Sequence, residues 1–246
     1  MAPAPALFVC DRGELARDVI VLAGAEGRHA MSARRITPGE RVDLTDGAGL
    51  VAECVVTSSR PGQLKLAVLR RRTAAPPAPR VVVVQAILKG DGSTLAVDLM
   101  TQVGVDAIVP WVAERSVPRW RPDRERAAVG RLRSTAIQAA KQSRRPYFPQ
   151  VSELTTTDGA VALVAGAALA LLLDPAAPAA LAAAQLPDSG DIVLLAGPEG
   201  GVSPAEGDAF ATAGAVRVRL GPTVLRGSSA GAVAAALILS RSGRWA

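Results

Sequence analysis

The stretch "LLAGPEGGVSPAE", residues 194–206, places an apolar run directly before three glycines and a proline, and then signals the start of a helix. The run from Asp191 to Gly197 is typical of a strand that is buried on both faces. Ser203, Pro204 and Glu206 have the spacing of a capping box with proline in the first turn. The stretch therefore predicts a strand, a glycine-rich loop and a helix, which is the repeating unit of α/β sheets.

A second unit of the same kind follows in "VRLGPTVLRGSSAG", residues 218–231. Here Gly221-Pro222 ends a strand, and Ser228 or Ser229 is expected to cap the next helix. Loops that follow parallel strands lie at the carboxyl edge of the sheet, where open α/β sheets bind ligands. Two such loops could line one pocket from both sides, although a pair of tight turns without a ligand is the alternative.

The glycine loop 197–202 constrains which ligand it could bind. Gly197, Gly200 and Gly201 would let the backbone approach a ligand closely or adopt positive φ. The loop has neither the Gly-x-Gly-x-x-Gly spacing of dinucleotide sites nor the Gly-Lys-Ser/Thr of phosphate loops. The carboxylate of Glu199 inside it disfavours a phosphate. A neutral or cationic ligand is therefore expected, and a dinucleotide-dependent oxidoreductase is the weaker alternative.

The rest of the chain divides at "TAAPPAPR", residues 73–80, where alternating alanine and proline predict a stiff linker. We predict a small β-barrel over 1–73, a linker over 74–80 and an α/β domain over 81–246. The barrel has a hairpin signal at Asp46-Gly47 and one expected helix over 26–36. In the second domain, strands are expected at 80–88, 107–114, 167–174, 191–197 and 215–221, and helices at 92–104, 124–143, 203–214 and 228–241. This alternation predicts a parallel sheet, and the first helix is expected to be amphipathic, with Leu95, Leu99 and Val103 on one face and Gly104 as its stop.

Composition excludes several classes of protein. Hydrophobic residues make up 49% of the 246 residues and aromatic residues only 3%, so the core must consist mainly of Ala, Val and Leu. Cys10 and Cys54 lie far apart and His29 is the only histidine, so we expect no metal site and two free thiols in a reducing compartment. The longest apolar run, 159–173, is shorter than the roughly 20 residues that span a bilayer. We expect a soluble cytoplasmic protein with no membrane partner.

Segment 114–145 contains ten basic and three acidic residues, although the whole chain carries a net charge of only +6. Guanidinium groups bind phosphates bidentately, so this segment is a candidate RNA-binding surface, with a solvated helix face as the alternative. Trp111, Trp120 and Tyr147 either stack on bases or belong to the core. The RNA-binding candidates are Arg115, Arg119, Arg133, Arg144 and Arg145, with Arg34 and Arg35 from the first domain.

The two glycine loops, 194–206 and 218–237, resemble those of the SPOUT-type, trefoil-knotted RNA methyltransferases. They are most similar to the family that methylates N3 of one uridine in small-subunit ribosomal RNA, which has Gly-Pro-Glu-Gly-Gly followed by Leu-Gly-x-x-(Ile/Val)-Leu-Arg. Residues 29–49, "HAMSARRITPGERVDLTDGAG", are similar to its N-terminal PUA-like barrel. Residues 85–117 and 136–151 resemble its first strand–helix–strand unit and its Ala-Ala-x-Gln-Ser-x-Arg segment. The resemblance thus covers nearly the whole chain in order.

This resemblance implies a fold, a cofactor and a substrate. The fold is α/β, with an N-terminal PUA-like β-barrel and a C-terminal domain in which a parallel sheet ends in a trefoil knot. The cofactor is S-adenosylmethionine, and the substrate is N3 of uridine 1498 in the 16S rRNA of the 30S ribosomal subunit. The family is homodimeric and needs no metal. The implied cofactor-binding residues are Leu172, Leu173, Gly197, Pro198, Glu199, Gly200, Gly201, Val202, Leu220, Gly221, Val224, Leu225 and Ser228.

Arg226 is the candidate catalytic residue, because its guanidinium could stabilise negative charge that develops on the uracil oxygens. A phosphate contact or an interface role is its alternative. Glu199 either acts as a base or orders its loop through backbone hydrogen bonds. The family commonly has Thr-Glu-Thr-Ala where this chain has Gly227-Ser228-Ser229-Ala230. That departure leaves two alternatives: an RNA-binding homologue with altered catalysis, or a methyltransferase for another RNA site.

Overall fold

A computed structural model describes residues 5–32, 34–117 and 122–245. The chain forms two compact units. The first runs to Pro76 and also includes Ala140–Phe148, and the second consists of Pro77–Ala139 and the chain from Pro149 onward. Ala140–Phe148 lies within the predicted α/β domain by sequence but packs with the first unit.

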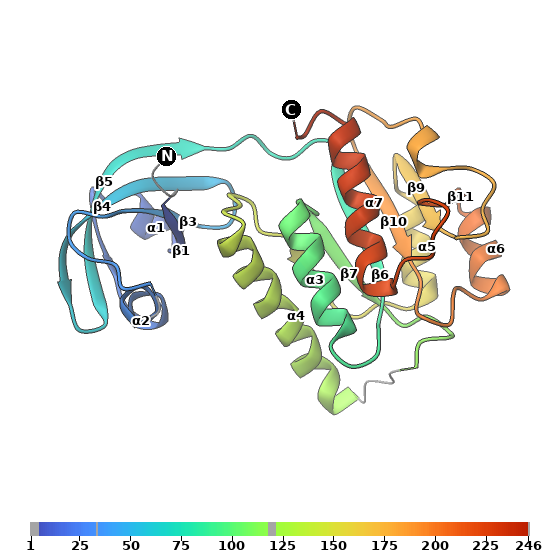
Figure 1. The fold of residues 1–246 in the computed structure, drawn as a ribbon, viewed down its shortest axis with the longest axis horizontal. Coiled ribbons are helices and arrows are strands. Elements are labelled where there is room, and N and C mark those ends of the chain that lie inside the picture. The colour runs from blue at the N-terminus through green and yellow to red at the C-terminus, as the bar shows by residue number, and fades with distance from the viewer. Residues whose placement is uncertain (1–4, 33, 118–121, 246) are drawn as a thin grey trace. The chain divides into compact units, whose positions relative to one another are not determined.

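The first unit is built on a five-stranded sheet of order β1-β3-β4-β5-β2 (Figure 1). Its elements are β1 (Ala6–Val9), α1 (Arg12–Leu15), β2 (Val19–Leu22), α2 (Gly24–Ser32), β3 (Arg41–Thr45), β4 (Leu50–Arg60) and β5 (Gln63–Thr73). The β3–β4 hairpin turns at Asp46-Gly47 as predicted. The carboxylate of Asp46 accepts hydrogen bonds from the backbone of Ala48 (2.8 Å) and Leu50 (3.1 Å), and Gly47 has φ of 70°.

Ala140–Phe148 contacts the rest of the first unit through backbone hydrogen bonds, an ion pair and aromatic packing. Lys141 Nζ lies 2.6 Å from Glu26 Oε1 and is only 6% exposed. Tyr147 packs so closely on Gly49 that a Cβ there would lie 2.4 Å from its ring, and its hydroxyl donates to Ala74 O (3.2 Å). Tyr147 is therefore a packing residue in this structure rather than a free stacking platform.

The second unit contains a six-stranded sheet of order β11-β9-β10-β6-β7-β8, and every pairing in it is parallel, as predicted. The strands are β6 (Arg80–Ala86), β7 (Ala107–Trp111), β8 (Gln150–Val151), β9 (Leu169–Leu173), β10 (Asp191–Ala196) and β11 (Val216–Val218). The helices are α3 (Gly92–Val103), α4 (Pro122–Gln142), α5 (Thr157–Ala165), α6 (Pro204–Thr212) and α7 (Gly227–Arg241), with a 3-10 turn at Leu181–Ala183 (Figure 1).

Both faces of this sheet are buried. Val81 and Val83 of β6 point to one side, where they meet Met100 of α3 and Ile238 of α7. The alternate residues Val82 and Val84 belong to a second cluster with Trp111, Phe210 and residues of α5. Because side chains alternate along a strand, a strand covered on both faces must be apolar throughout, which explains the continuous Val and Leu runs.

The predicted apolar face of α3 is confirmed for Leu99 and Val103, which are half-buried against the core, and is wrong for Leu95. The helix buries Ala96, Val97 and Met100, whereas Leu95 is 48% exposed. Helix α7 approaches this buried face closely, since a Cβ on Gly231 would lie 3.1 Å from the sulfur of Met100. Met100 therefore packs against the backbone of α7 at a glycine. The run 159–173 is also interrupted, because α5 ends at Ala165 and β9 begins at Leu169. No helix among the described residues is long and apolar enough to cross a bilayer.

The start of β7 is fixed to the C-terminal segment by a buried ion pair. Arg244 Nη2 donates to Asp106 Oδ1 (3.1 Å), and Nη1 donates to Pro79 O (3.2 Å). Asp106 Oδ2 also accepts from Val81 N (2.9 Å), and the Asp106 side chain is only 4% exposed.

We expect Arg244→Ala to lower the free energy of unfolding by about 3 kcal/mol, because it leaves a buried carboxylate without its cation. Urea unfolding, followed by the fluorescence of buried Trp111, measures the loss. Arg80→Ala is the control, since its ion pair with Asp191 is exposed, and it should cost below about 1 kcal/mol. Equal losses in the two variants would contradict a stabilising role for the buried pair.

Candidate active site

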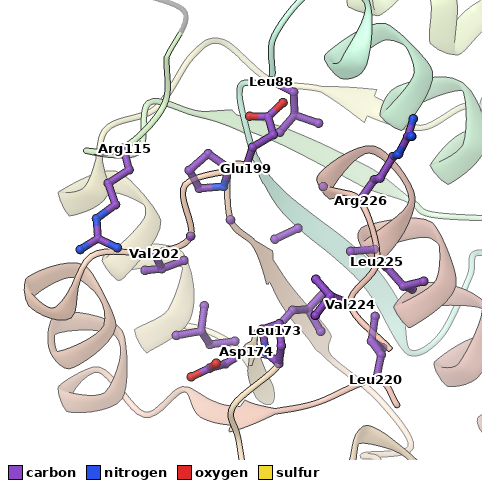
Figure 2. A pocket seen from close by; sticks show the side chains of 18 of the residues that line it. Leu88, Arg115, Leu173, Asp174, Glu199, Val202, Leu220, Val224, Leu225 and Arg226 are labelled. Carbon is purple, nitrogen blue, oxygen red and sulfur yellow. The ribbon is translucent and has the colours of Figure 1, made fainter. Parts of the chain in front are cut away.

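A pocket of about 970 Å³ lies at the carboxyl ends of four neighbouring parallel strands (Figure 2). Its walls come from the segments that follow β6, β9, β10 and β11. This is the edge at which open α/β sheets bind ligands, and the volume lies at the upper end of the range for small-molecule sites. Of the thirteen predicted cofactor-binding residues, all except Gly200 line this pocket.

The first loop, Gly197–Val202, has the conformation that its glycines were expected to allow. Gly201 has φ of 74°, and its backbone N–H donates to Pro198 O (2.9 Å). A Cβ on Gly197 would lie 2.7 Å from Val202, so the loop folds tightly on itself. Gly200 instead packs against the backbone of Arg115, where a Cβ would lie 3.4 Å from the carbonyl oxygen. Its role in the structure is close packing beside the pocket.

Glu199 connects two of the pocket walls. Its Oε1 accepts a hydrogen bond from the backbone N–H of Lys89 (3.2 Å), in the segment that follows β6. Figure 2 shows Glu199 beside Leu88 and on the same side of the pocket as Arg226. The structure thus supports the interpretation that Glu199 orders its loop through a backbone hydrogen bond, and this bond reaches a neighbouring loop.

Glu206 is a buried carboxylate that joins three segments. Its capping box with Ser203 is confirmed: Glu206 N donates to Ser203 Oγ (3.3 Å), and Ser203 N donates to Glu206 Oε2 (3.1 Å). Glu206 Oε1 also accepts from Glu114 N (2.8 Å) and from Thr157 Oγ1 (3.0 Å). The start of α6, the segment after β7 and the start of α5 are therefore held together directly behind the first loop.

The second loop reaches the first through a glycine. A Cβ on Gly227 would lie 3.0 Å from Leu88 and 3.3 Å from the carbonyl oxygen of Gly197. The helix α7 begins at this residue with Arg226 as its N-cap, so the prediction that Ser228 or Ser229 caps the helix is wrong. Ser229 Oγ instead donates back to Arg226 O (3.1 Å). The helix therefore starts one residue before Ser228, and Arg226 lines the pocket.

A further charged group at the pocket was not predicted. Arg217 of β11 donates to Asp208 of α6 (3.1 Å) and lies 3.9 Å from Asp174, which follows β9. Gly207 makes room for the guanidinium, because a Cβ there would lie 2.6 Å from it. All four residues line the pocket. No motif identifies such a group, since its members come from three separate elements.

The predicted RNA-binding arginines come from both units of the chain. Arg115 lines the pocket and donates to Gly200 O (3.3 Å). Arg133 on α4 donates to Val151 O (3.0 Å) and Glu153 (2.7 Å), so its guanidinium takes part in the fold. Arg34, Arg35, Arg144 and Arg145 belong to the first unit, and Arg119 lies outside the described residues.

The other candidate side chains have structural roles. Trp111 is fully buried, meets Phe210 edge-on at 5.3 Å and donates to Thr157 Oγ1 (3.2 Å), so it belongs to the core. Trp120 lies outside the described residues. Burial raises the pKa of the Cys10 and Cys54 thiols to about 11, so both are poor nucleophiles at neutral pH. Among the residues described, no three His, Cys, Asp or Glu side chains are grouped as metal ligands would be.

Comparison with known proteins places this architecture in a family. A family model for the RNA methyltransferase domain matches residues 63–239, and one for the RNA methyltransferase PUA domain matches residues 22–69. The chain is 44% identical to ribosomal RNA small subunit methyltransferase E of Mycobacterium bovis over 234 residues, which is 92% of this chain and 88% of that protein. The Bacillus subtilis protein of the same name is 24% identical, with 85% of each chain covered.

Solved structures share the fold. The ribosomal RNA small subunit methyltransferase E of Neisseria gonorrhoeae, solved with S-adenosylmethionine, superposes with a TM-score of 0.84 at 23% identity, covering 97% of this chain and 98% of that one. A putative methyltransferase from Legionella pneumophila, also solved with that molecule, gives a TM-score of 0.85 at 22% identity, covering 97% and 98%.

We expect Glu206→Gln to lower the free energy of unfolding by about 2 kcal/mol. A glutamine amide has one acceptor oxygen where the carboxylate has two, so at least one of the three buried donors loses its hydrogen-bond acceptor. Urea unfolding measures the loss. Glu153→Gln is the matched control, because the Glu153 side chain is 70% exposed and pairs only at the surface, so it should cost below about 1 kcal/mol. A loss at Glu206 no larger than this control would contradict the joining role of its carboxylate.

Proposed function

The chain belongs to the RNA methyltransferase family with an N-terminal PUA domain, and we propose that it methylates small-subunit ribosomal RNA with S-adenosylmethionine as the methyl donor. The observation that carries the proposal is the pocket formed jointly by the two glycine loops. The proposal is supported by the M. bovis relative, which is named ribosomal RNA small subunit methyltransferase E and is 44% identical to this chain over 234 residues. We propose further that the target atom is N3 of uridine 1498 in 16S rRNA, as the family resemblance implies.

The pocket residues fit S-adenosylmethionine in chemistry as well as in size. Apolar side chains of Leu172, Leu173, Val202 and Leu220 line it and suit a flat adenine ring. Carboxylates of Asp174 and Glu199 also line it, and they suit a cationic ligand far better than a phosphate. When bound, this cofactor supplies the electrophilic methyl group. The remaining work of the protein is to bind, orient and exclude water.

The residues that would hold the cofactor come from the end of β9, with Leu172 and Leu173, and from the two loops of the pocket. The first loop would contribute backbone groups of Gly197 to Val202, and the second loop would contribute Leu220 to Leu225. Glu199 fixes the first loop through Lys89 N, so the backbone is ordered before a ligand arrives. Val224 is 77% exposed at the pocket, and we propose that the nucleoside covers part of this apolar surface.

Arg226 is our proposed catalytic residue. It lines the pocket, its side chain is exposed, and among the described residues it forms no ion pair. Its guanidinium is therefore available to a uracil oxygen, where it would stabilise the negative charge that develops as N3 loses its proton. The base must be unpaired to reach the pocket, because N3 lies within the Watson–Crick pair.

Two further features remain proposals from the family resemblance. We propose that the C-terminal segment passes through a loop to form a trefoil knot, which the contact of Gly227 with Gly197 O supports. We also propose that two copies form a homodimer in the cytoplasm. The exposed Leu95 and Val224, both at the pocket, supply apolar surface that a partner would cover.

The function is tested with Arg226→Ala. Calorimetry should detect S-adenosylmethionine binding to the wild type, and the variant should bind within about threefold, because the guanidinium acts on the RNA base. Methyl transfer to 30S subunits that lack the modification should fall about 100-fold or more, the size of effect seen when one stabilising donor is removed.

Arg80→Ala is the control, since Arg80 opens β6 at the opposite end of the strand from the pocket. It should retain wild-type transfer. Normal cofactor and RNA binding by the wild type without any transfer would favour the alternative of an RNA-binding homologue with altered catalysis. Failure to bind S-adenosylmethionine at millimolar concentration would overturn the proposal.

RNA contact is tested by comparing Arg115→Ala with Arg133→Ala. Arg115 lies at the pocket, and among the residues that the structure describes its guanidinium donates to one carbonyl oxygen, that of Gly200, so it should contact a phosphate beside the target base. Its loss should weaken rRNA binding and reduce the slope of log K against log salt by about 0.7 to 0.9. Arg133 already binds Val151 O and Glu153, so its loss should lower stability with a smaller change in the slope. The reverse order of the two slopes would contradict this assignment.

A further inference from the structure

Asp174 occupies the end of the pocket formed by β9. Its backbone N–H donates to Val218 O (2.9 Å), which places its Cα directly after the paired ends of β9 and β11. Figure 2 shows its carboxylate beside Leu173, on the opposite side of the view from Glu199 and Arg226. Asp174 is therefore the charged side chain next to the apolar wall of Leu172, Leu173 and Leu220.

The two carboxylate oxygens of Asp174 have different partners. Oδ1 accepts a hydrogen bond from Ala176 N (2.9 Å), which fixes the orientation of the side chain. Oδ2 accepts no hydrogen bond from any residue the structure describes, and its nearest cation, Arg217 Nη1, is 3.9 Å away. That distance is too long for a hydrogen bond. The side chain is 29% exposed, so one acceptor is held in a fixed orientation at the wall of the pocket.

The other contacts of Arg217 hold its guanidinium beyond hydrogen-bond distance of Asp174. Its Nη2 donates to Asp208 (3.1 Å), and the guanidinium fits against Gly207 without a side chain in the way. The cation thus compensates the charge of Asp174 without occupying its free oxygen. A carboxylate compensated in this way attracts an ammonium group less strongly than an isolated one, but it remains a good acceptor for a neutral hydroxyl.

The position of this acceptor favours a contact with the ribose of the bound methyl donor over a contact with its amino-acid tail. A base lying on the leucine wall would place its attached ribose within one bond of that wall, whereas the amino-acid tail lies several bonds further away. A carboxylate at the carboxyl end of a parallel strand is also the group that holds ribose hydroxyls in other α/β nucleoside sites. We infer that Asp174 Oδ2 accepts a hydrogen bond from a ribose hydroxyl of the bound methyl donor, with Arg217 and Asp208 as positioning residues. The inference rests on the proposed function.

A chemical double-mutant cycle tests the inference. The probes are 5′-methylthioadenosine and its 2′-deoxy and 3′-deoxy analogues, measured by calorimetry on the full chain. In the wild type, loss of the contacted hydroxyl should weaken binding about tenfold, which is typical of a hydrogen bond to a charged group. In Asp174→Ala, binding of the parent nucleoside should fall about tenfold, and removal of the same hydroxyl should then cost little more. Asp188→Ala, an exposed acid away from the pocket, should match the wild type.

The outcomes separate this inference from the proposed function. If either deoxy analogue shows a loss in the wild type that disappears in Asp174→Ala, the contact is established. If both analogues lose the same factor in wild type and variant while S-adenosylmethionine still binds, the inference is overturned and the function stands. Should the wild type not bind S-adenosylmethionine at all, both fail.

Asp174→Asn covers the case in which the alanine variant does not fold. Its amide oxygen accepts more weakly than a carboxylate, so the penalty for losing the hydroxyl should shrink without vanishing. A penalty in Asp174→Asn equal to that of the wild type would also overturn the inference.

Discussion

The pocket depends on one close approach, between the start of α7 and the carbonyl oxygen of Gly197. A Cβ at position 227 would lie 3.3 Å from that oxygen and 3.0 Å from Leu88, so glycine allows this approach without a shift of either neighbour. The contact brings the loop after β11 against the loop after β10, although 24 positions separate Gly197 from Gly221 in the chain.

The walls of the pocket differ in how firmly they are held. Glu206 binds three backbone or hydroxyl donors behind the first loop, and Glu199 joins that loop to Lys89. The second loop has fewer such bonds, and Val224 and Arg226 are exposed on it. A preorganised wall lowers the entropy cost of binding, while an exposed wall leaves its side chains available to a large substrate. This division suits a site that binds a small cofactor and an RNA base together.

The sequence predicted the α/β architecture because its signals are local. Continuous Val and Leu runs, the Ser203–Glu206 capping box and the Gly104 stop each depend on neighbouring residues, and the structure has all three. It predicted wrongly where a distant element decided the outcome. Leu95 is exposed at the pocket while Val97 and Met100 take the buried positions of α3, and α7 begins at Gly227, which lies close to the first loop.

By itself, the sequence determined the parallel sheet and the two glycine loops, and its family resemblance implied thirteen cofactor residues, of which twelve line the pocket. Strand ends and glycine loops are recognised from neighbouring residues in the sequence, so predicting them requires no knowledge of tertiary contacts. Only the tertiary structure decided that Asp174, Asp208 and Arg217 form one group, and that Arg133 is used by the fold. The physical reason is that an ion pair depends on distance in space, and these charges come from strands and helices whose neighbours are set by the packing of the whole sheet.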